Sequence, residues 1–136
     1  LVAPWTTYAI NSILFPGKVG YALDKDFAPI SMIGFQPMAL LVNGNMPAKS
    51  AADLVAMAKA KPGSMSYGST GPGSLEHIAA EMFKQQAGVN IQHIPYKGTN
   101  DLISDLLTGR VPISFMSPLI AKNHVDQRKL LALGVT

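Results

Sequence analysis

The sequence predicts an α/β fold in which a mostly parallel sheet is flanked by helices. Two observations support this fold class. Short apolar or alternating runs are separated by amphipathic segments of helical length, which is the pattern of βαβ units. In addition, 48% of the 136 residues are hydrophobic and 14% are charged, as expected for a compact chain rather than a disordered one. The length is that of one domain.

The first part of the chain is expected to be irregular and to end in two strands. Residues 1–28 contain prolines and glycines that interrupt regular structure. The apolar runs "ISMIGF" (30–35) and "MALLVN" (38–43) predict two short strands, which the pair Gln36-Pro37 separates.

The remainder predicts helices that alternate with strands. Ser50 and Asp53 have the spacing of a capping box and predict a helix over 50–61. A second helix is expected over 74–87, with Gly88 as its stop signal. The other expected elements are strands at 64–69, 89–96, 110–117 and 129–135, and helices at 101–109 and 118–125.

Composition excludes several classes of function. The net charge is only +3, and the basic residues are scattered without interleaved aromatic residues, so a nucleic-acid partner is not expected. The absence of cysteine excludes disulfides, thiolate metal sites and thiol nucleophiles. No apolar run reaches the ~18 residues of a membrane span. The start "LVAPWTTYAINS" lacks a signal-peptide pattern, and the strand-like ends predict that the chain is a domain cut from a longer protein.

The stretch "SYGSTGPGSLEHIAAEMF" (66–83) places glycines and hydroxyl residues directly before a helix. Gly68 and Gly73 have the spacing of a phosphate loop, but Ser74 and Leu75 stand where that loop needs its lysine and its magnesium-binding hydroxyl. Glu76 replaces the third glycine of a dinucleotide fingerprint. No serine here has glycine two residues before and two after it, as a nucleophile elbow requires.

Two interpretations of this loop remain open. A helix N-terminus attracts an anion through unpaired N–H groups and partial positive charge, and glycines and hydroxyls would let a carboxylate approach. Alternatively, Ser74 only caps the helix and the glycines only make a tight turn.

No catalytic or metal site is evident elsewhere in the sequence. His77 and Glu81 are four residues apart on one helix face but have no third ligand, so no metal is expected. His93 and His124 fall in other elements, and nothing in the sequence links the three histidines. The i,i+4 pair of Asp101 and Asp105 is interpreted as solvated. No cofactor is expected.

Several stretches together resemble the tripartite tricarboxylate transporter receptors, the Bug (TctC-like) solute-binding proteins. They are "DKDFAPISMIG", "NMPAKSAADL", "KPGSMSYGSTGPGSLEH", "HIPYKG", "DLLTGRV" and "LLALGVT", in the order of the family. The resemblance implies a periplasmic receptor with a type II periplasmic-binding-protein fold, in which two α/β domains enclose a cleft. Such a receptor binds a small carboxylate and delivers it to membrane permease subunits.

The resemblance also implies how the chain is divided and where a ligand would bind. Residues 1–28 would be a hinge or crossover segment, 29–129 the second domain and 130–136 the return hinge strand, with the signal peptide outside this fragment. The "SFMSPL" stretch departs from the family, because Met116 and Ser117 stand where an acidic residue is usual, which favours a plain carboxylate over an amino acid. The implied ligand-binding residues are Ser69, Thr70, Gly71, Gly73, Ser74, His77, Tyr96, Thr7 and Ser117.

The sequence therefore favours a binding domain without catalysis, and two alternatives from other classes remain. A serine-type hydrolase could use Ser69 or Ser74 with His77, although no orienting carboxylate is evident. An interaction module could form a dimer through exposed strands of the isolated domain.

Overall fold

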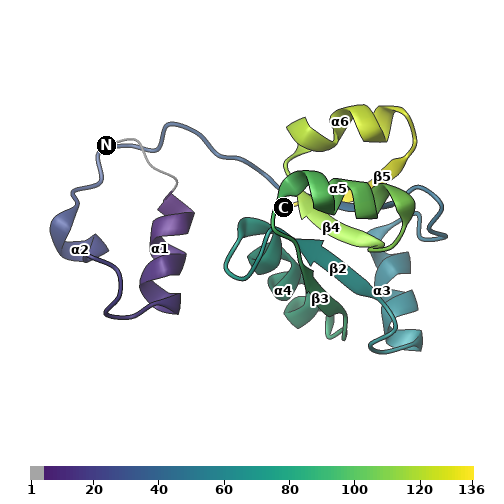
Figure 1. Ribbon diagram of the computed structural model, residues 1–136, viewed down its shortest axis with the longest axis horizontal. Helices are drawn as coiled ribbons and strands as arrows, with labels where there is room; N and C mark the ends of the chain where they lie inside the picture. Colours follow the sequence, from purple (N-terminus) through teal and green to yellow (C-terminus); the bar gives the residue numbers. More distant parts are fainter. Residues whose placement is uncertain (1–4) are drawn as a thin grey trace. The chain divides into compact units, whose positions relative to one another are not determined.

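The computed structural model describes the backbone of residues 5–136 and the side chains of residues 8–136. The chain forms two compact units, Leu1–Phe35 and Gln36–Thr136 (Figure 1). No helix in the described part of the chain has both the length and the apolar character that a membrane crossing requires.

The first unit is more regular than its sequence predicts. It contains α1 (Trp5–Leu14) and the short α2 (Leu23–Asp26). Three aromatic rings of this unit form a cluster. The ring centroids of Tyr8 and Tyr21 are 5.4 Å apart, and Phe27 lies edge-on to both. The prediction of irregular structure throughout 1–28 is therefore wrong for α1, because the interrupting Pro-Gly pair comes only after this helix ends.

The strand expected at residues 30–35 is absent. This run pairs with no other strand in the described part of the chain, and its apolar side chains point into solvent, from 99% exposed at Ile30 to 78% at Phe35. The apolar pattern of these residues favours a strand, but a strand forms only where an adjacent strand pairs with it through hydrogen bonds. The run is extended chain that leads into the second unit.

The second unit is built on a five-stranded sheet with the strand order β3-β2-β4-β1-β5. β2 pairs in parallel with both β3 and β4, whereas β1 pairs antiparallel with both β4 and β5. Four strands thus run in one direction and β1 in the other, so the sheet is mixed, with two parallel and two antiparallel pairings, rather than mostly parallel as the sequence predicts. The strands are β1 (Ala39–Asn43), β2 (Ser66–Ser69), β3 (Gln92–Pro95), β4 (Ile113–Met116) and β5 (Leu130–Val135).

Helices cover both faces of this sheet (Figure 1). Because strand side chains alternate, Leu40 and Val42 of β1 join the core under one pair of helices, while Ala39 and Leu41 join the core under the other. All five residues of β1 are buried, as expected for a strand covered on both sides. The first pair is α3 (Ala51–Ala60) and α4 (Leu75–Ala87), and the second is α5 (Thr99–Thr108) and α6 (Pro118–Asp126).

Local signals set the helix ends, and the sequence predicted them within a few residues. The Ser50 hydroxyl accepts a hydrogen bond from the Asp53 N–H at 3.1 Å, and the Asp53 carboxylate accepts one from the Lys49 N–H at 3.0 Å. At the C-terminal end of α4, Gly88 adopts the left-handed conformation with φ 63° and terminates the helix.

Close packing behind β2 fixes the position of the loop that follows it. A Cβ atom on Gly68 would lie 2.2 Å from Cδ1 of Leu102 and 3.1 Å from Cε2 of Tyr96. Only glycine therefore lets α5 and the end of β3 approach β2 this closely.

Candidate functional site

Three of the sequence-predicted site positions meet at one edge of the sheet. Ser69 ends β2, Tyr96 directly follows β3, and Ser117 directly follows β4. These strands are parallel neighbours, so their carboxyl ends lie together, which is where open α/β sheets usually bind ligands. The loop Thr70–Ser74, which we call the β2–α4 loop, starts at the central strand of the three.

The β2–α4 loop is a tight turn held by its own hydrogen bonds. Gly71 and Gly73 have φ values of 122° and 81°, which favour glycine. The Gly71 N–H donates to the Ser69 hydroxyl at 3.1 Å, and the Ser74 N–H donates to the Gly71 carbonyl at 3.2 Å. The Gly73 N–H donates to Nδ1 of His77 at 3.1 Å. The glycines thus shape the turn, as one of the two sequence interpretations proposed.

Ser74 is the N-cap of α4, where its hydroxyl accepts a hydrogen bond from the His77 N–H at 3.3 Å. Among the residues that the structure describes, the N–H groups of Leu75 and Glu76 find no acceptor, and the Ser74 hydroxyl donates no hydrogen bond. Three donors therefore remain available at the positive end of α4, which has the properties of an anion site.

Ser69 lies beneath the loop rather than on its surface. Its side chain is fully buried, and its Oγ atom is 2.7 Å from Nε2 of His93. The same oxygen accepts the Gly71 N–H. Ser69 therefore holds the loop in shape and has no exposed surface to offer a ligand.

His93 and His77 form a stack that sequence inspection did not detect. The ring centroids of His77 and His93 are 4.4 Å apart and their planes are tilted by 31°, and Tyr67 stacks on His93 at 4.9 Å and lies 6.4 Å from His77. The interpretation that nothing links the histidines is therefore wrong for this pair, because the β2–β3 register places His93 beside Tyr67 and α4 returns His77 to the same place. His124 lies on α6 and takes no part.

Burial lowers the pKa of His93, and the neighbouring imidazole of His77 lowers it further. The stack continues into charged groups on α4: Glu81 accepts hydrogen bonds from the Tyr67 hydroxyl and from the Lys84 ammonium, both at 2.6 Å. Burial raises the pKa of Tyr67, and the hydrogen bond to Glu81 raises it further. Burial also opposes ionisation of Glu81, but the bonds from Lys84 and Tyr67 outweigh it, and the pKa of this carboxyl falls.

Acidic side chains accept hydrogen bonds from two of the predicted site residues. The Thr70 hydroxyl donates to the Glu76 carboxylate at 2.9 Å, and the Tyr96 hydroxyl donates to Asp105 at 3.0 Å. Asp105 also accepts from Arg110 at 3.2 Å, so the interpretation of Asp105 as a solvated residue is wrong. Burial and the bond to Asp105 raise the pKa of Tyr96.

The other predicted site residues contribute less to this arrangement. Ser117 is buried at the start of α6 and makes no side-chain cap there. Thr7 belongs to α1, and its side chain lies outside the described residues. In the described part of the chain, His77 and Glu81 join no group of three or more metal-ligating side chains.

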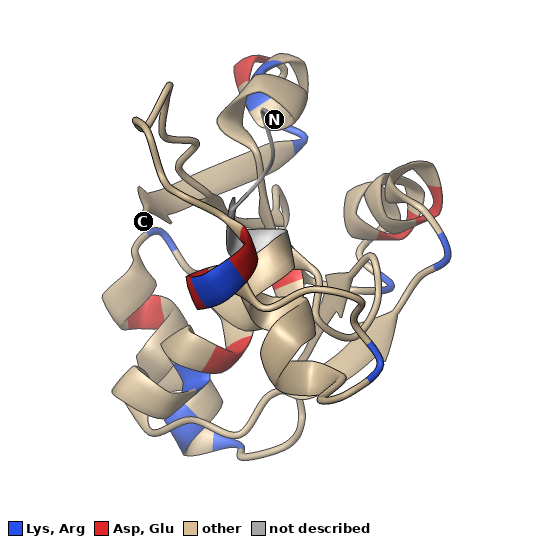
Figure 2. Cartoon of the chain, turned by 90° about the vertical axis from the view of Figure 1, so that its left-hand side faces the viewer, with Lys and Arg blue, Asp and Glu red and all other residues tan. Residues whose placement is uncertain are grey.

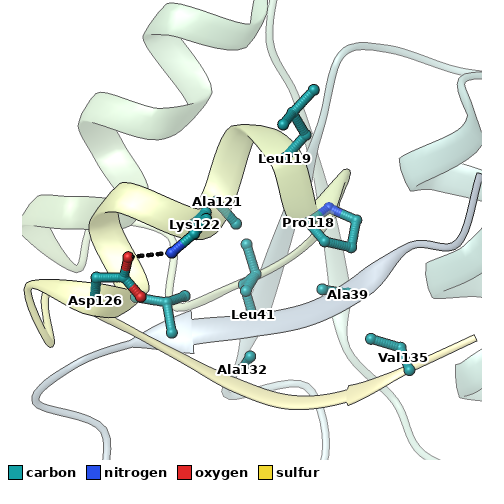
Figure 3. Close-up of a pocket in the computed structure, with 10 residues that line it drawn as sticks. Ala39, Leu41, Pro118, Leu119, Ala121, Lys122, Asp126, Ala132 and Val135 are labelled. Carbon is teal, nitrogen blue, oxygen red and sulfur yellow. Dashed lines mark hydrogen bonds and ion pairs between the residues drawn. The ribbon is translucent and has the colours of Figure 1, made fainter.

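An apolar hollow of about 400 Å³ lies elsewhere, between α6 and the strands β1 and β5 (Figure 3). Leu41, Ala132 and Val135 line it together with residues of α6, and no residue of the β2–α4 loop does. Basic and acidic residues are spread over several elements rather than gathered in one patch (Figure 2). The polar β2–α4 loop is therefore the better candidate for a small anion.

Comparison with known proteins identifies the family. Residues 6–136 match the profile of the family described as "Tripartite tricarboxylate transporter family receptor". The chain belongs to this family. Protein BugT of Bordetella pertussis is 32% identical over 127 residues, which are 93% of this chain and 39% of that protein. A UPF0065 protein of Pseudomonas sp. strain P51 is 30% identical over 131 residues, 96% of this chain and 39% of that protein. The chain thus spans about two fifths of these relatives.

Solved structures confirm the fold. A structure described as a periplasmic transporter has a TM-score of 0.84 and 30% identity, and the match covers 98% of this chain and 44% of that one. The R. palustris protein Rpa4515, solved with adipate, has a TM-score of 0.74 and 34% identity, with 86% of this chain and 39% of that one covered. The expected periplasmic-binding-protein type of α/β fold is therefore correct.

Proposed function

We propose that this chain is the ligand-binding part of an extracytoplasmic receptor that binds a small organic carboxylate and presents it to a tripartite tricarboxylate-type membrane transporter. Family membership supports the receptor role. The adipate in the R. palustris relative supports the ligand class. The receptor acts in the periplasm, its partners are the permease subunits, and it carries out no catalysis.

One observation is the main support for this proposal. The start of α4 offers hydrogen-bond donors that have no acceptor among the described residues. The hydroxyl of Ser74 and the N–H groups of Leu75 and Glu76 are available there, next to the tight turn that Gly71 and Gly73 shape. Hydrogen bonds and the helix dipole suffice for a carboxylate, whereas a triphosphate needs a lysine and a metal ion. The ligand's other groups would be bound by the remainder of the receptor.

The proposed domain arrangement follows the family. Residues 29–129 would be the second domain of a two-domain receptor, with 1–28 leading into it and 130–136 leading out. A hinge rotation would then bury the ligand between the two domains.

A hydrolase function is less well supported than binding. The Ser69 hydroxyl and His93 form a close serine–histidine pair at 2.7 Å. However, Ser69 is fully buried, and within the described residues no carboxylate accepts a hydrogen bond from His93 to orient it. This pair is suited to holding the loop rather than to attacking a substrate.

An NMR titration of the chain with adipate tests the proposal. We expect progressive shifts of the amide signals of Gly71, Gly73, Leu75 and Glu76. The dissociation constant should be millimolar or weaker, because a few hydrogen bonds supply about 4 kcal/mol or less.

The neutral diamide of adipic acid is the matched control, since it has the same length but no charge. Equal shifts with the diamide would contradict carboxylate recognition. Shifts confined to the apolar hollow beside α6 would place the ligand at another site.

A further inference from the structure

The donors of the β2–α4 loop fall into two classes. Those of Ser74, Leu75 and Glu76 are available, as described above. The Thr70 hydroxyl and the Gly73 N–H are occupied, by the Glu76 carboxylate at 2.9 Å and by Nδ1 of His77 at 3.1 Å. Each occupied donor has a single hydrogen, so it cannot serve a ligand while the protein group keeps it.

The Glu76 carboxylate has the same chemistry as the ligand proposed for this site. It is an anion in the first turn of α4, where the helix dipole stabilises negative charge. It also accepts the hydroxyl hydrogen bond that a bound carboxylate would accept. A second carboxylate at the start of α4 would be repelled by it.

His77 occupies the Gly73 amide in one protonation state only. A nitrogen that accepts an N–H bond carries no proton, so this hydrogen bond forms only while the imidazole is neutral with its hydrogen on Nε2. The same ring packs against His93, with the two centroids 4.4 Å apart. Tyr67 from β2 and His93 from β3 lie against the ring, and Glu81 of α4 lies near enough to interact with it electrostatically.

We propose that Glu76 and His77 compete with the ligand for the β2–α4 loop. In the free protein they occupy the Thr70 hydroxyl and the Gly73 amide, and a ligand carboxylate binds fully only by displacing both. Glu76 is thereby a specificity-determining residue. Because its carboxylate accepts the Thr70 hydrogen bond and repels other anions, a ligand must be the stronger hydrogen-bond acceptor to bind in its place. This inference rests on the proposed function and adds the determinant of its affinity.

The variant Glu76→Gln tests the inference in the complete 136-residue chain, with adipate as the probe and NMR as the readout. Glutamine keeps the shape of the side chain and removes the charge. We expect the dissociation constant to fall about two- to fivefold, the effect of one partly exposed charge interaction. The control Asp126→Asn removes an exposed carboxylate from α6 and should leave the dissociation constant unchanged. Equal or weaker binding by Glu76→Gln would overturn the inference.

The side-chain nitrogen signals of His77 provide a second measurement. In the free chain they should show a neutral ring with Nδ1 as the acceptor, and saturating adipate should move the Nδ1 signal together with the Gly73 amide signal. Adipate that shifts the amides of Leu75 and Glu76 while Nδ1 stays unchanged would overturn the competition but leave the proposed function standing. If adipate shifts no loop amide in either chain, both fail.

Discussion

At the scale of single residues, the partial burial of His93 makes the stability of the folded chain depend on pH. Burial lowers the pKa of His93 in the folded state, so the unfolded chain takes up a proton at a higher pH than the folded chain. We therefore expect the free energy of unfolding to fall as the pH drops from about 7.5 through the ordinary histidine range near 6.5. The loss should stop below the folded-state pKa, where both states are protonated. Urea unfolding at several pH values measures it.

The variant His93→Gln isolates this effect, because the amide can still bond to Ser69 but does not titrate. The curve of the variant should be flatter than that of the parent chain between about pH 7.5 and 5.5. His77 and His124 are present in both chains, so His93 is the only histidine that differs between them. Identical slopes would show that His93 is not the group responsible.

The residue types of the loop and the cap at Ser74 were predictable from the sequence, but the role of Ser69 was not. The hydroxyls of Ser69 and Ser74 both mark a polar loop, yet one is buried against His93 and the other caps a helix. This difference depends on the register that sets Tyr67 opposite His93, which only the folded sheet defines. The hydrogen bond from the Thr70 hydroxyl to the Glu76 carboxylate could not be predicted either, because the sequence does not show in which direction the Glu76 side chain extends.

At the scale of elements, a comparison of two helix-capping serines distinguishes an effect on stability from an effect on ligand binding. Ser50 and Ser74 have the same role at the starts of α3 and α4, where each accepts an N–H bond from the residue three positions on. We expect Ser50→Ala and Ser74→Ala each to cost about 1 kcal/mol of stability. Only Ser74→Ala should also weaken adipate binding, because Ser74 has a hydroxyl hydrogen available at the proposed site. Thermal unfolding and the adipate titration measure the two effects. Equal adipate affinity in both variants would remove Ser74 from the site.

Element prediction succeeded where the signal is local. The ends of α3 and α4 follow from a cap and a left-handed glycine, which act within a single turn. It failed for residues 30–35, because pairing depends on a distant partner, and it did not specify that β1 runs against its neighbours. Helix α1 was missed because it has neither an acidic first turn nor a basic last turn to mark its ends.

At the scale of the whole molecule, the exposed run 30–35 predicts self-association. Ile30, Met32, Ile33 and Phe35 are 78–99% exposed, and the run has no strand partner in the described part of the chain. An extended apolar segment with free backbone groups pairs readily with a second copy of itself. We therefore expect the mass measured by light scattering to rise above the 14.4 kDa of one chain as the concentration increases.

Two lysine substitutions separate apolar contact from net charge in this association. Ile33→Lys replaces an exposed apolar side chain and should reduce the association, whereas Ser31→Lys adds the same charge two positions away and keeps every apolar residue. If charge repulsion alone controlled association, both variants would behave alike. A stronger effect of Ile33→Lys assigns the contact to the apolar side chains. A mass that stays at one chain over the whole concentration range would rule out the contact between copies.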